Sequence, residues 1–115
     1  MLRETDRLAE AEPLYRRALA IDERSYGPDH PTVATRLNNL ALLLRDTNRP
    51  GEAEPLFRRG VRILIEFQHR TGHEHPNFRV VRANYVRFLE ALGKTPAQIE
   101  QQLDELISPP RSEGT

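Results

Sequence analysis

The strongest constraint on this fold is an internal repeat. Residues 9–19 read AEAEPLYRRAL and residues 51–61 read GEAEPLFRRGV, 42 positions later, with seven of eleven positions identical. The segment GPDHP at residues 27–31 returns as GHEHP at residues 72–76, 45 positions later. The three extra residues fall between Val61 and Gly72, where RILIEFQHRT is longer than the matching AIDERSY. A repeat of this length, built from two helical patterns, predicts an α-solenoid of stacked antiparallel helix pairs.

Composition and charge narrow the range of functions. Seventeen basic and seventeen acidic residues cancel, so no long-range field directs the molecule toward nucleic acid or an anionic membrane. The absence of cysteine excludes disulfides and thiolate chemistry. No apolar run approaches the roughly 20 residues of a membrane helix, and the N-terminus is too polar for a signal peptide. We therefore expect a soluble, cytoplasmic protein with no nucleic-acid or membrane partner.

Apolar residues at three- and four-residue spacing predict an all-α chain. The expected helices span about residues 7–24, 31–46, 52–68, 77–92 and 96–107. Asp29 or His30 is the expected cap of the second helix, with Pro31 near its first position. Gly93 is expected to end the fourth helix, and Thr95-Pro96-Ala97-Gln98 has the form of a capping box for the last one. Glu12 and Arg16 form an expected i,i+4 ion pair in the first helix.

These helices predict one repeat domain over residues 1–107, with units at about 1–26, 27–71 and 72–107. This amounts to about two and a half repeats plus a C-terminal capping helix, since the last helix lacks the EAEP pattern. Residues 108–115, SPPRSEGT, form an expected disordered tail. The first unit aligns only with the end of the next one, so we expect a truncated first repeat or a fragment of a longer array.

At GPDHPTVATRLNNLALLLRDTNRPGEAEPLFRR the sequence resembles a tetratricopeptide repeat of the long, 42-residue kind found in kinesin light chains and many bacterial signalling proteins. The resemblance covers about Met1 to Leu92. It implies helix pairs wound in a right-handed superhelix, whose first helices line a concave face that binds extended peptides. It also implies a set of packing positions that lock the two helices of a repeat: Leu40, Ala41, Leu44, Ala53, Phe57 and Gly60.

The resemblance places a peptide-binding groove on the first helix of each repeat. In the central repeat Asn38 would pair with the ligand backbone, because an amide offers donor and acceptor together. Arg45 and Arg87 would bind carboxylates of the ligand. In the last repeat Arg82 replaces Leu37 and Ala83 replaces Asn38, so that repeat is atypical. The full set of expected peptide-binding residues is Thr35, Asn38, Leu42, Arg45, Ala83, Arg87 and Glu90.

Several of these residues also have a structural interpretation. Asn39 and Asn84 can hydrogen-bond a neighbouring helix from half-buried positions. Arg45 and Arg87 can form surface pairs with Asp46 or Glu90. The histidines of HxxxHxH at residues 69–75 resemble metal ligands, but His30 recurs in the same turn without neighbouring histidines, which favours a capping role. We therefore predict no metal and no cofactor.

The sequence contains no nucleophile motif, no phosphate-binding loop and no isolated pair of carboxylates, so we expect no enzyme activity. The leading hypothesis is a non-catalytic module that binds a protein or peptide partner in the concave groove. The alternative is a structural, self-associating segment, possible as a homodimer through an apolar face of the first helix formed by Leu8, Ala11, Tyr15 and Ala18. A third reading, RNA binding, requires a basic groove and fails if the arginines pair with carboxylates.

Overall fold

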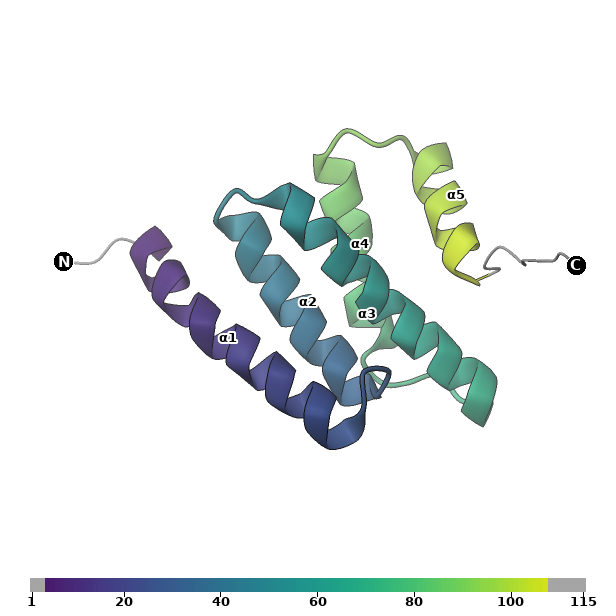
Figure 1. The fold of residues 1–115 in the computed structure, drawn as a ribbon. Coiled ribbons are helices and arrows are strands. Elements are labelled where there is room, and N and C mark those ends of the chain that lie inside the picture. Colours follow the sequence, from purple (N-terminus) through teal and green to yellow (C-terminus); the bar gives the residue numbers. More distant parts are fainter. Residues whose placement is uncertain (1–3, 108–115) are drawn as a thin grey trace, which may run out of the picture.

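The fold is an all-α solenoid. The computed structural model describes residues 4–107. Within this range the helices are α1 (Glu4–Tyr26), α2 (Pro31–Asp46), α3 (Pro50–Thr71), α4 (Phe78–Ala91) and α5 (Pro96–Ile107), joined by short turns (Figure 1). This confirms the predicted fold class. The predicted tail, residues 108–115, lies outside the described residues.

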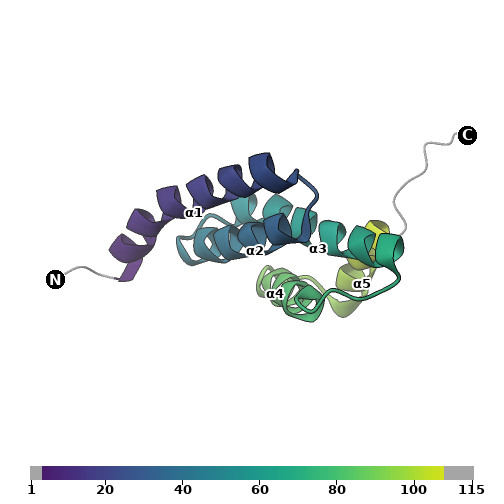
Figure 2. The same ribbon diagram turned by 90° about the horizontal axis from the view of Figure 1, so that it is seen from below.

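The helices form a stack with α2 and α3 at its centre. These two helices pack against each other as an antiparallel pair, and α1 and α4 lie on opposite sides of α2 (Figures 1 and 2). α5 packs against α3 and α4, so α1 and α5 occupy the two ends of the stack. The resulting body is elongated, with extents of 56 × 37 × 27 Å.

The helix ends follow from local sequence signals. α2 has both of its predicted ends, and its first turn is capped by His30, whose Nδ1 accepts a hydrogen bond from the Thr32 N–H at 3.1 Å. The capping box before α5 is also confirmed, since the Gln98 N–H donates to Thr95 Oγ1 at 3.2 Å and the Thr95 N–H donates to Gln98 Oε1 at 2.9 Å. α1 and α3 are each a few residues longer than predicted at both ends.

The core lies between α2, α3 and α4, and α5 closes it. The six predicted packing positions in α2 and α3 are all buried. Gly60 shows why a small residue is needed there, because an added Cβ would lie 3.3 Å from the Ala34 carbonyl oxygen. On α4 the aromatic rings of Tyr85 and Phe88 lie 6.1 and 4.9 Å from that of Phe57. This three-ring cluster fixes α4 against α3.

α4 does not follow the register of α2 in its first half. At the 45-residue offset Arg36 corresponds to Val81 and Leu37 to Arg82. Arg36 is exposed while Val81 is buried, and Leu37 is buried while Arg82 is exposed. The apolar position facing the core has therefore moved by one residue, which agrees with the atypical last repeat. None of the helices within residues 4–107 combines the length and apolar character needed to cross a membrane.

Candidate peptide-binding surface

The expected peptide-binding residues lie on two neighbouring first helices. On α2 the spacing of three and four residues places four of them along one side of the helix. The remaining three lie on α4, which runs beside α2 (Figure 2). We call this set the α2–α4 surface: Thr35, Asn38, Leu42, Arg45, Ala83, Arg87 and Glu90.

Two of these residues hold the helices together. The Asn84 Nδ2 donates to Asn38 Oδ1 at 3.2 Å, and the Asn77 Nδ2 donates to Thr35 Oγ1 at 3.2 Å. Asn38 is only 5% exposed. Its amide oxygen is thus engaged by α4 instead of being presented to solvent. The sequence could not reveal this, because Asn84 is 46 residues away and belongs to the shifted helix.

The two asparagines with a predicted structural role behave differently. Asn84 is half-buried and hydrogen-bonds α2, as expected. Asn39 is exposed, so its predicted half-buried position is wrong. It lies next to Asn38 in sequence, and one residue rotates the side chain by about 100° around the helix. Asn39 consequently faces the side of α2 that carries α1.

The other residues of the α2–α4 surface are accessible. Leu42 is half-buried and packs against the core from outside. Arg45 is exposed and pairs with Asp46 at 2.8 Å, which is the surface pair considered above. Arg87 is exposed and donates to Asn84 Oδ1 at 3.4 Å, and no carboxylate of the described residues pairs with it. Ala83 is half-buried and Glu90 exposed.

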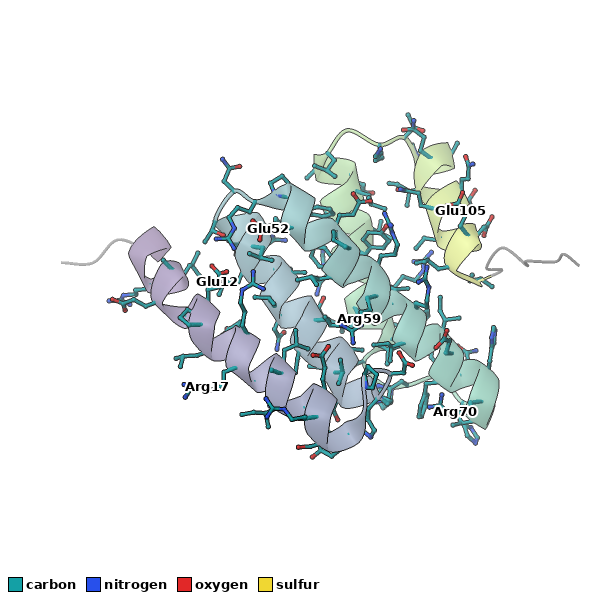
Figure 3. The ribbon with its side chains drawn as sticks, viewed as in Figure 1. Glu12, Arg17, Glu52, Arg59, Arg70 and Glu105 are labelled. Carbon is teal, nitrogen blue, oxygen red and sulfur yellow. The ribbon has the colours of Figure 1, made fainter. Side chains whose placement is uncertain are left out.

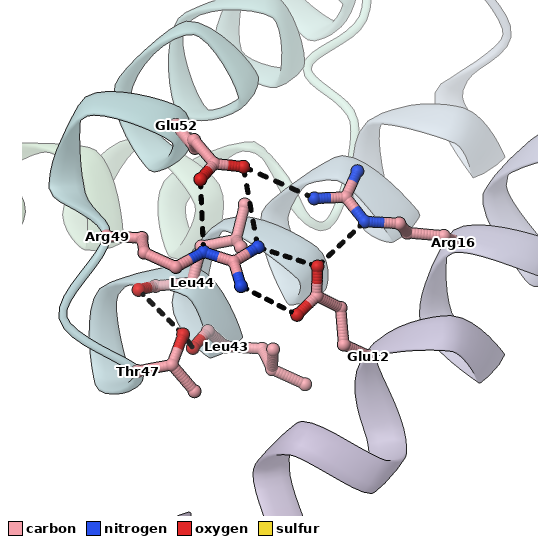
Figure 4. Close-up of polar contacts among 7 residues, drawn as sticks. All are labelled: Glu12, Arg16, Leu43, Leu44, Thr47, Arg49 and Glu52. Atoms are coloured by element: carbon pink, nitrogen blue, oxygen red, sulfur yellow. Dashed lines mark hydrogen bonds and ion pairs between the residues drawn. The ribbon is translucent and has the colours of Figure 1, made fainter.

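On the other side of the molecule, ion pairs link α1 to α3. Arg49 donates from Nη1 to Glu12 Oε1 at 3.0 Å and from Nη2 to Glu12 Oε2 at 2.6 Å, and Arg16 also donates to Glu12 at 2.9 Å (Figure 4). Glu52 lies 3.1 Å from Arg49 and 3.6 Å from Arg16. The Arg49 hydrogen bonds, and then those of Arg16, lower the pKa of Glu12 below its ordinary value. The Glu12–Arg16 pair was predicted, whereas the Arg49 partner was not.

A second link lies further along the same helices. Arg59 is on α3 (Figure 3). It pairs with Glu23 at 2.8 Å and donates to the Pro28 carbonyl oxygen at 2.9 Å. Seven arginines of the described residues are paired with carboxylates in this way, whereas Arg82 and Arg87 of α4 are not, so the condition that would count against a basic RNA-binding groove is met only in part. The paired arginines are Arg16, Arg36, Arg45, Arg49, Arg58, Arg59 and Arg79.

A pocket of about 260 Å³ opens between α1 and α2. It is lined by Leu14, Tyr15, Ala18, Arg36 and Asn39. The side chain of Leu14 is 65% exposed and that of Tyr15 is 40% exposed. Apolar side chains so exposed beside polar ones are typical of contact surfaces. Of the apolar face predicted from the sequence, only Tyr15 is exposed, whereas Leu8, Ala11 and Ala18 are half-buried. That prediction did not include Leu14, Arg36 or Asn39.

Two histidines accept the same kind of local hydrogen bond in the two repeated turns. His75 Nδ1 accepts a hydrogen bond from the Asn77 N–H at 3.1 Å, as His30 does from Thr32. The repeated histidine therefore serves the turn, as predicted. Within residues 4–107, His69, His73 and His75 are not part of any group of three potential metal ligands.

The comparison with known families agrees with this architecture. No curated protein matches the chain. The sequence model of the family described as "Tetratricopeptide repeat" matches residues 1–66. This range contains α1, α2 and most of α3, and it is more than half of the 115 residues. The chain belongs to the tetratricopeptide repeat family.

Proposed function

We propose that this protein is a non-catalytic interaction module that binds a peptide segment of a partner protein on the α2–α4 surface. Tetratricopeptide repeats are generally protein–protein interaction modules. The observation that carries the proposal is the combination of Leu42, an accessible apolar side chain, with two exposed guanidinium groups on the same pair of helices. The 42-residue spacing supports the kinesin-light-chain-like type of repeat.

In this proposal Arg87 and Arg45 select the ligand. Arg87 has one weak bond to Asn84, at 3.4 Å, so most of its donors are free to bind a carboxylate. Arg45 can exchange Asp46 for a ligand carboxylate at little cost, because an exposed ion pair contributes only about 0–1 kcal/mol. The expected ligand therefore carries acidic side chains next to an apolar residue that contacts Leu42.

Asn38 and Thr35 have an indirect role in this proposal. Their bonds to α4 fix the distance between Leu42 and Arg87 across the two helices. Ala83 leaves room beside them, and Glu90 disfavours acidic groups at the far end of the surface. The ligand backbone is then held mainly by side chains other than Asn38.

The test is a selection of peptides from a random display library, followed by affinity measurements on charge-reversal variants. Arg45→Glu and Arg87→Glu should each lower the affinity for the selected peptides by about tenfold or more. Arg82→Glu is the matched control, because Arg82 is exposed on α4 but lies outside the surface. Equal weakening by Arg82→Glu would show a general charge effect and contradict the proposal.

A second candidate is self-association through α1. The observation that favours it is the exposure of Leu14, Tyr15 and Ile21, at 65%, 40% and 50%. Light scattering behind a sizing column, over a concentration series, would give a mass that rises to that of a dimer. A monomer at every concentration contradicts this candidate.

A cytoplasmic site of action is a separate proposal, tested by locating the tagged protein in cell fractions.

A further inference from the structure

The last repeat has two polar residues at positions that are apolar in the central repeat. At the 45-residue offset, Tyr85 of α4 corresponds to Leu40 of α2. The first residues of α3 and α5 are both proline and lie 46 positions apart, and at this offset Gln102 corresponds to Leu56. Leu40 is fully buried, and Leu56 packs against the core. The helix pair α4–α5 therefore brings a hydroxyl and an amide to positions that are apolar in the pair α2–α3.

The burial pattern of α5 supports this alignment. Its three buried residues are Ile99, Leu103 and Leu106. At the 46-residue offset they correspond to three buried residues of α3: Ala53, Phe57 and Gly60. Gln102 precedes Leu103 and is half-buried. Its side chain therefore lies at the edge of the contact that α5 makes with the core.

Both polar side chains contain a buried atom that has no hydrogen-bond partner among the described residues. These atoms are Tyr85 Oη and Gln102 Oε1, and the Tyr85 residue as a whole is fully buried. Such atoms are rare in folded proteins, because they have lost their contact with solvent and gained no bond in return. Another atom of this kind, Arg49 Nε, lies 3.1 Å from Glu52 Oε2, so an ion pair compensates for its burial.

The Tyr85 hydroxyl faces the side of α5 that carries Gln102. α4 and α5 pack against each other, and Glu105 lies on α5 (Figure 3). Burial raises the pKa of Tyr85, and Arg58 offsets part of this rise. The Glu105 carboxylate adds to the rise, so it lies within electrostatic reach of the hydroxyl. Because residues three apart lie on the same side of a helix, Gln102 is directed toward the same region as Glu105.

A water molecule can satisfy both atoms at once. The Tyr85 hydroxyl has a proton to donate, and Gln102 Oε1 requires a donor. Water offers an acceptor and a donor in a small volume, and buried water molecules typically bond to about two to four polar groups. Both atoms are already enclosed by described residues, so a helix stacked outside α4 and α5 could not reach them.

We propose that one internal water molecule binds between Tyr85 Oη and Gln102 Oε1 and bridges α4 to α5. It accepts a hydrogen bond from the Tyr85 hydroxyl and donates one to Gln102. Arg58 of α3 offers a third partner, because its guanidinium has donors besides the Nη2 that bonds Glu54 at 2.9 Å. Hydrogen bonds are directional, so the bridge orients α5 against α4 in addition to their apolar contacts. The site is separate from the α2–α4 surface and does not depend on its function.

The test is ¹⁷O magnetic relaxation dispersion on the full-length protein, which counts the water molecules that stay bound for longer than the protein takes to tumble. Tyr85→Phe removes the hydroxyl, and Gln102→Leu restores the residue type of the central repeat. Each variant should lose one long-lived water molecule relative to wild type, and the double variant should lose no more than one. The matched controls are Tyr15→Phe and Gln101→Leu at exposed positions, and both should keep the wild-type number.

A crystal structure of wild type locates the water molecule, which should lie about 3 Å from both Tyr85 Oη and Gln102 Oε1. Thermal unfolding checks that the variants are folded, and Gln102→Leu alone gives the test where Tyr85→Phe does not fold. Equal numbers of long-lived water molecules in wild type and Gln102→Leu overturn the proposal. A crystal structure in which Tyr85 Oη bonds directly to Gln102 or Arg58, with no water molecule between α4 and α5 at this point, also overturns it.

Discussion

Glu12 of α1 and Arg49 before α3 form two parallel hydrogen bonds, of 3.0 and 2.6 Å, although 37 residues separate them. This bidentate contact joins the last helix of one repeat to the turn between the two helices of the next. Arg16 and Glu52 extend it on either side (Figure 4). The cluster is a polar link between α1 and α3, and the pKa of its Glu12 carboxyl is lowered by Arg49 and then by Arg16.

The first prediction concerns the acid stability of wild type and Glu12→Gln. The pKa of Glu12 is lowered in the folded state by Arg49, then by Arg16, from an ordinary value of 4.5. The unfolded state thus binds more protons in acid. The stabilisation is complete above about pH 4.5 and is lost as pH falls through the lower folded pKa. Urea unfolding at pH 7 and in acid should show that Glu12→Gln loses less stability than wild type over this range.

Glu10→Gln is the control for this experiment, since Glu10 is an exposed glutamate on the same helix. It should keep the pH dependence of wild type. Identical pH profiles for wild type and Glu12→Gln would show that the Arg49 contact does not persist in solution.

The second prediction concerns Asn38→Ala. Because Asn38 is 5% exposed and its oxygen accepts from Asn84, the substitution removes a hydrogen bond and leaves a half-buried donor. The free energy of unfolding should fall by about 0.5–1.5 kcal/mol. Asn39→Ala, at the exposed neighbouring position, should change it by less than about 0.5 kcal/mol. Chemical denaturation measures both losses. A larger loss for Asn39→Ala than for Asn38→Ala would show that α2 is rotated about its axis relative to the structure.

The third prediction concerns the repeat core. Leu40 is fully buried, so Leu40→Ala should lower the free energy of unfolding by about 2–5 kcal/mol. Leu14→Ala removes the same atoms from a side chain that is 65% exposed, and it should cost less than about 0.5 kcal/mol. Denaturation midpoints of the two variants give the comparison. A loss below about 1 kcal/mol for Leu40→Ala would mean that Leu40 is not in the core.

The fourth prediction concerns alkaline stability. Burial raises the pKa of Tyr85, and the nearby Arg58 offsets part of this effect. The folded state therefore keeps the proton when an unfolded tyrosine, with a pKa near 10, releases it. The free energy of unfolding of wild type should fall as pH rises above about 10. That of Tyr85→Phe should fall less steeply, because the variant has no hydroxyl at this position to titrate. Urea unfolding between about pH 9 and 11 gives the dependence of the unfolding free energy on pH. Equal slopes for wild type and Tyr85→Phe would contradict a buried, protonated Tyr85.

The features predicted correctly from the sequence are local or repeated. Pro31 and Asp46 were identified as the ends of α2, and Thr95 and Gln98 as a capping box, because these signals lie within a few residues of each other. The packing role of Gly60 came from its alignment with Ala18 across the repeat. Such patterns fix which residues are helical and which side of each helix is apolar.

The features that were not predicted depend on how one helix rotates against another. Val81 is an apolar position of the 77–92 pattern, but its effect on the contact with α2 has no local signal: it faces the core one residue before the position aligned with Leu37. Asn38 consequently faces α4, while Asn39 faces the pocket beside α1. A rotation of about 100° per residue is enough to exchange a ligand-facing amide for a buried one. The Glu12–Arg49 bond has no local signal either, because it connects different repeats.

The proposed function requires that the α2–α4 surface binds a peptide of a partner protein. The most direct test is an NMR titration of the ¹⁵N-labelled full-length protein with the strongest peptide from the display library. The largest amide shifts should cluster at Leu42, Arg45, Ala83 and Arg87, and Arg87→Glu should abolish them. Shifts that cluster elsewhere, or that persist unchanged in Arg87→Glu, would contradict the proposed function.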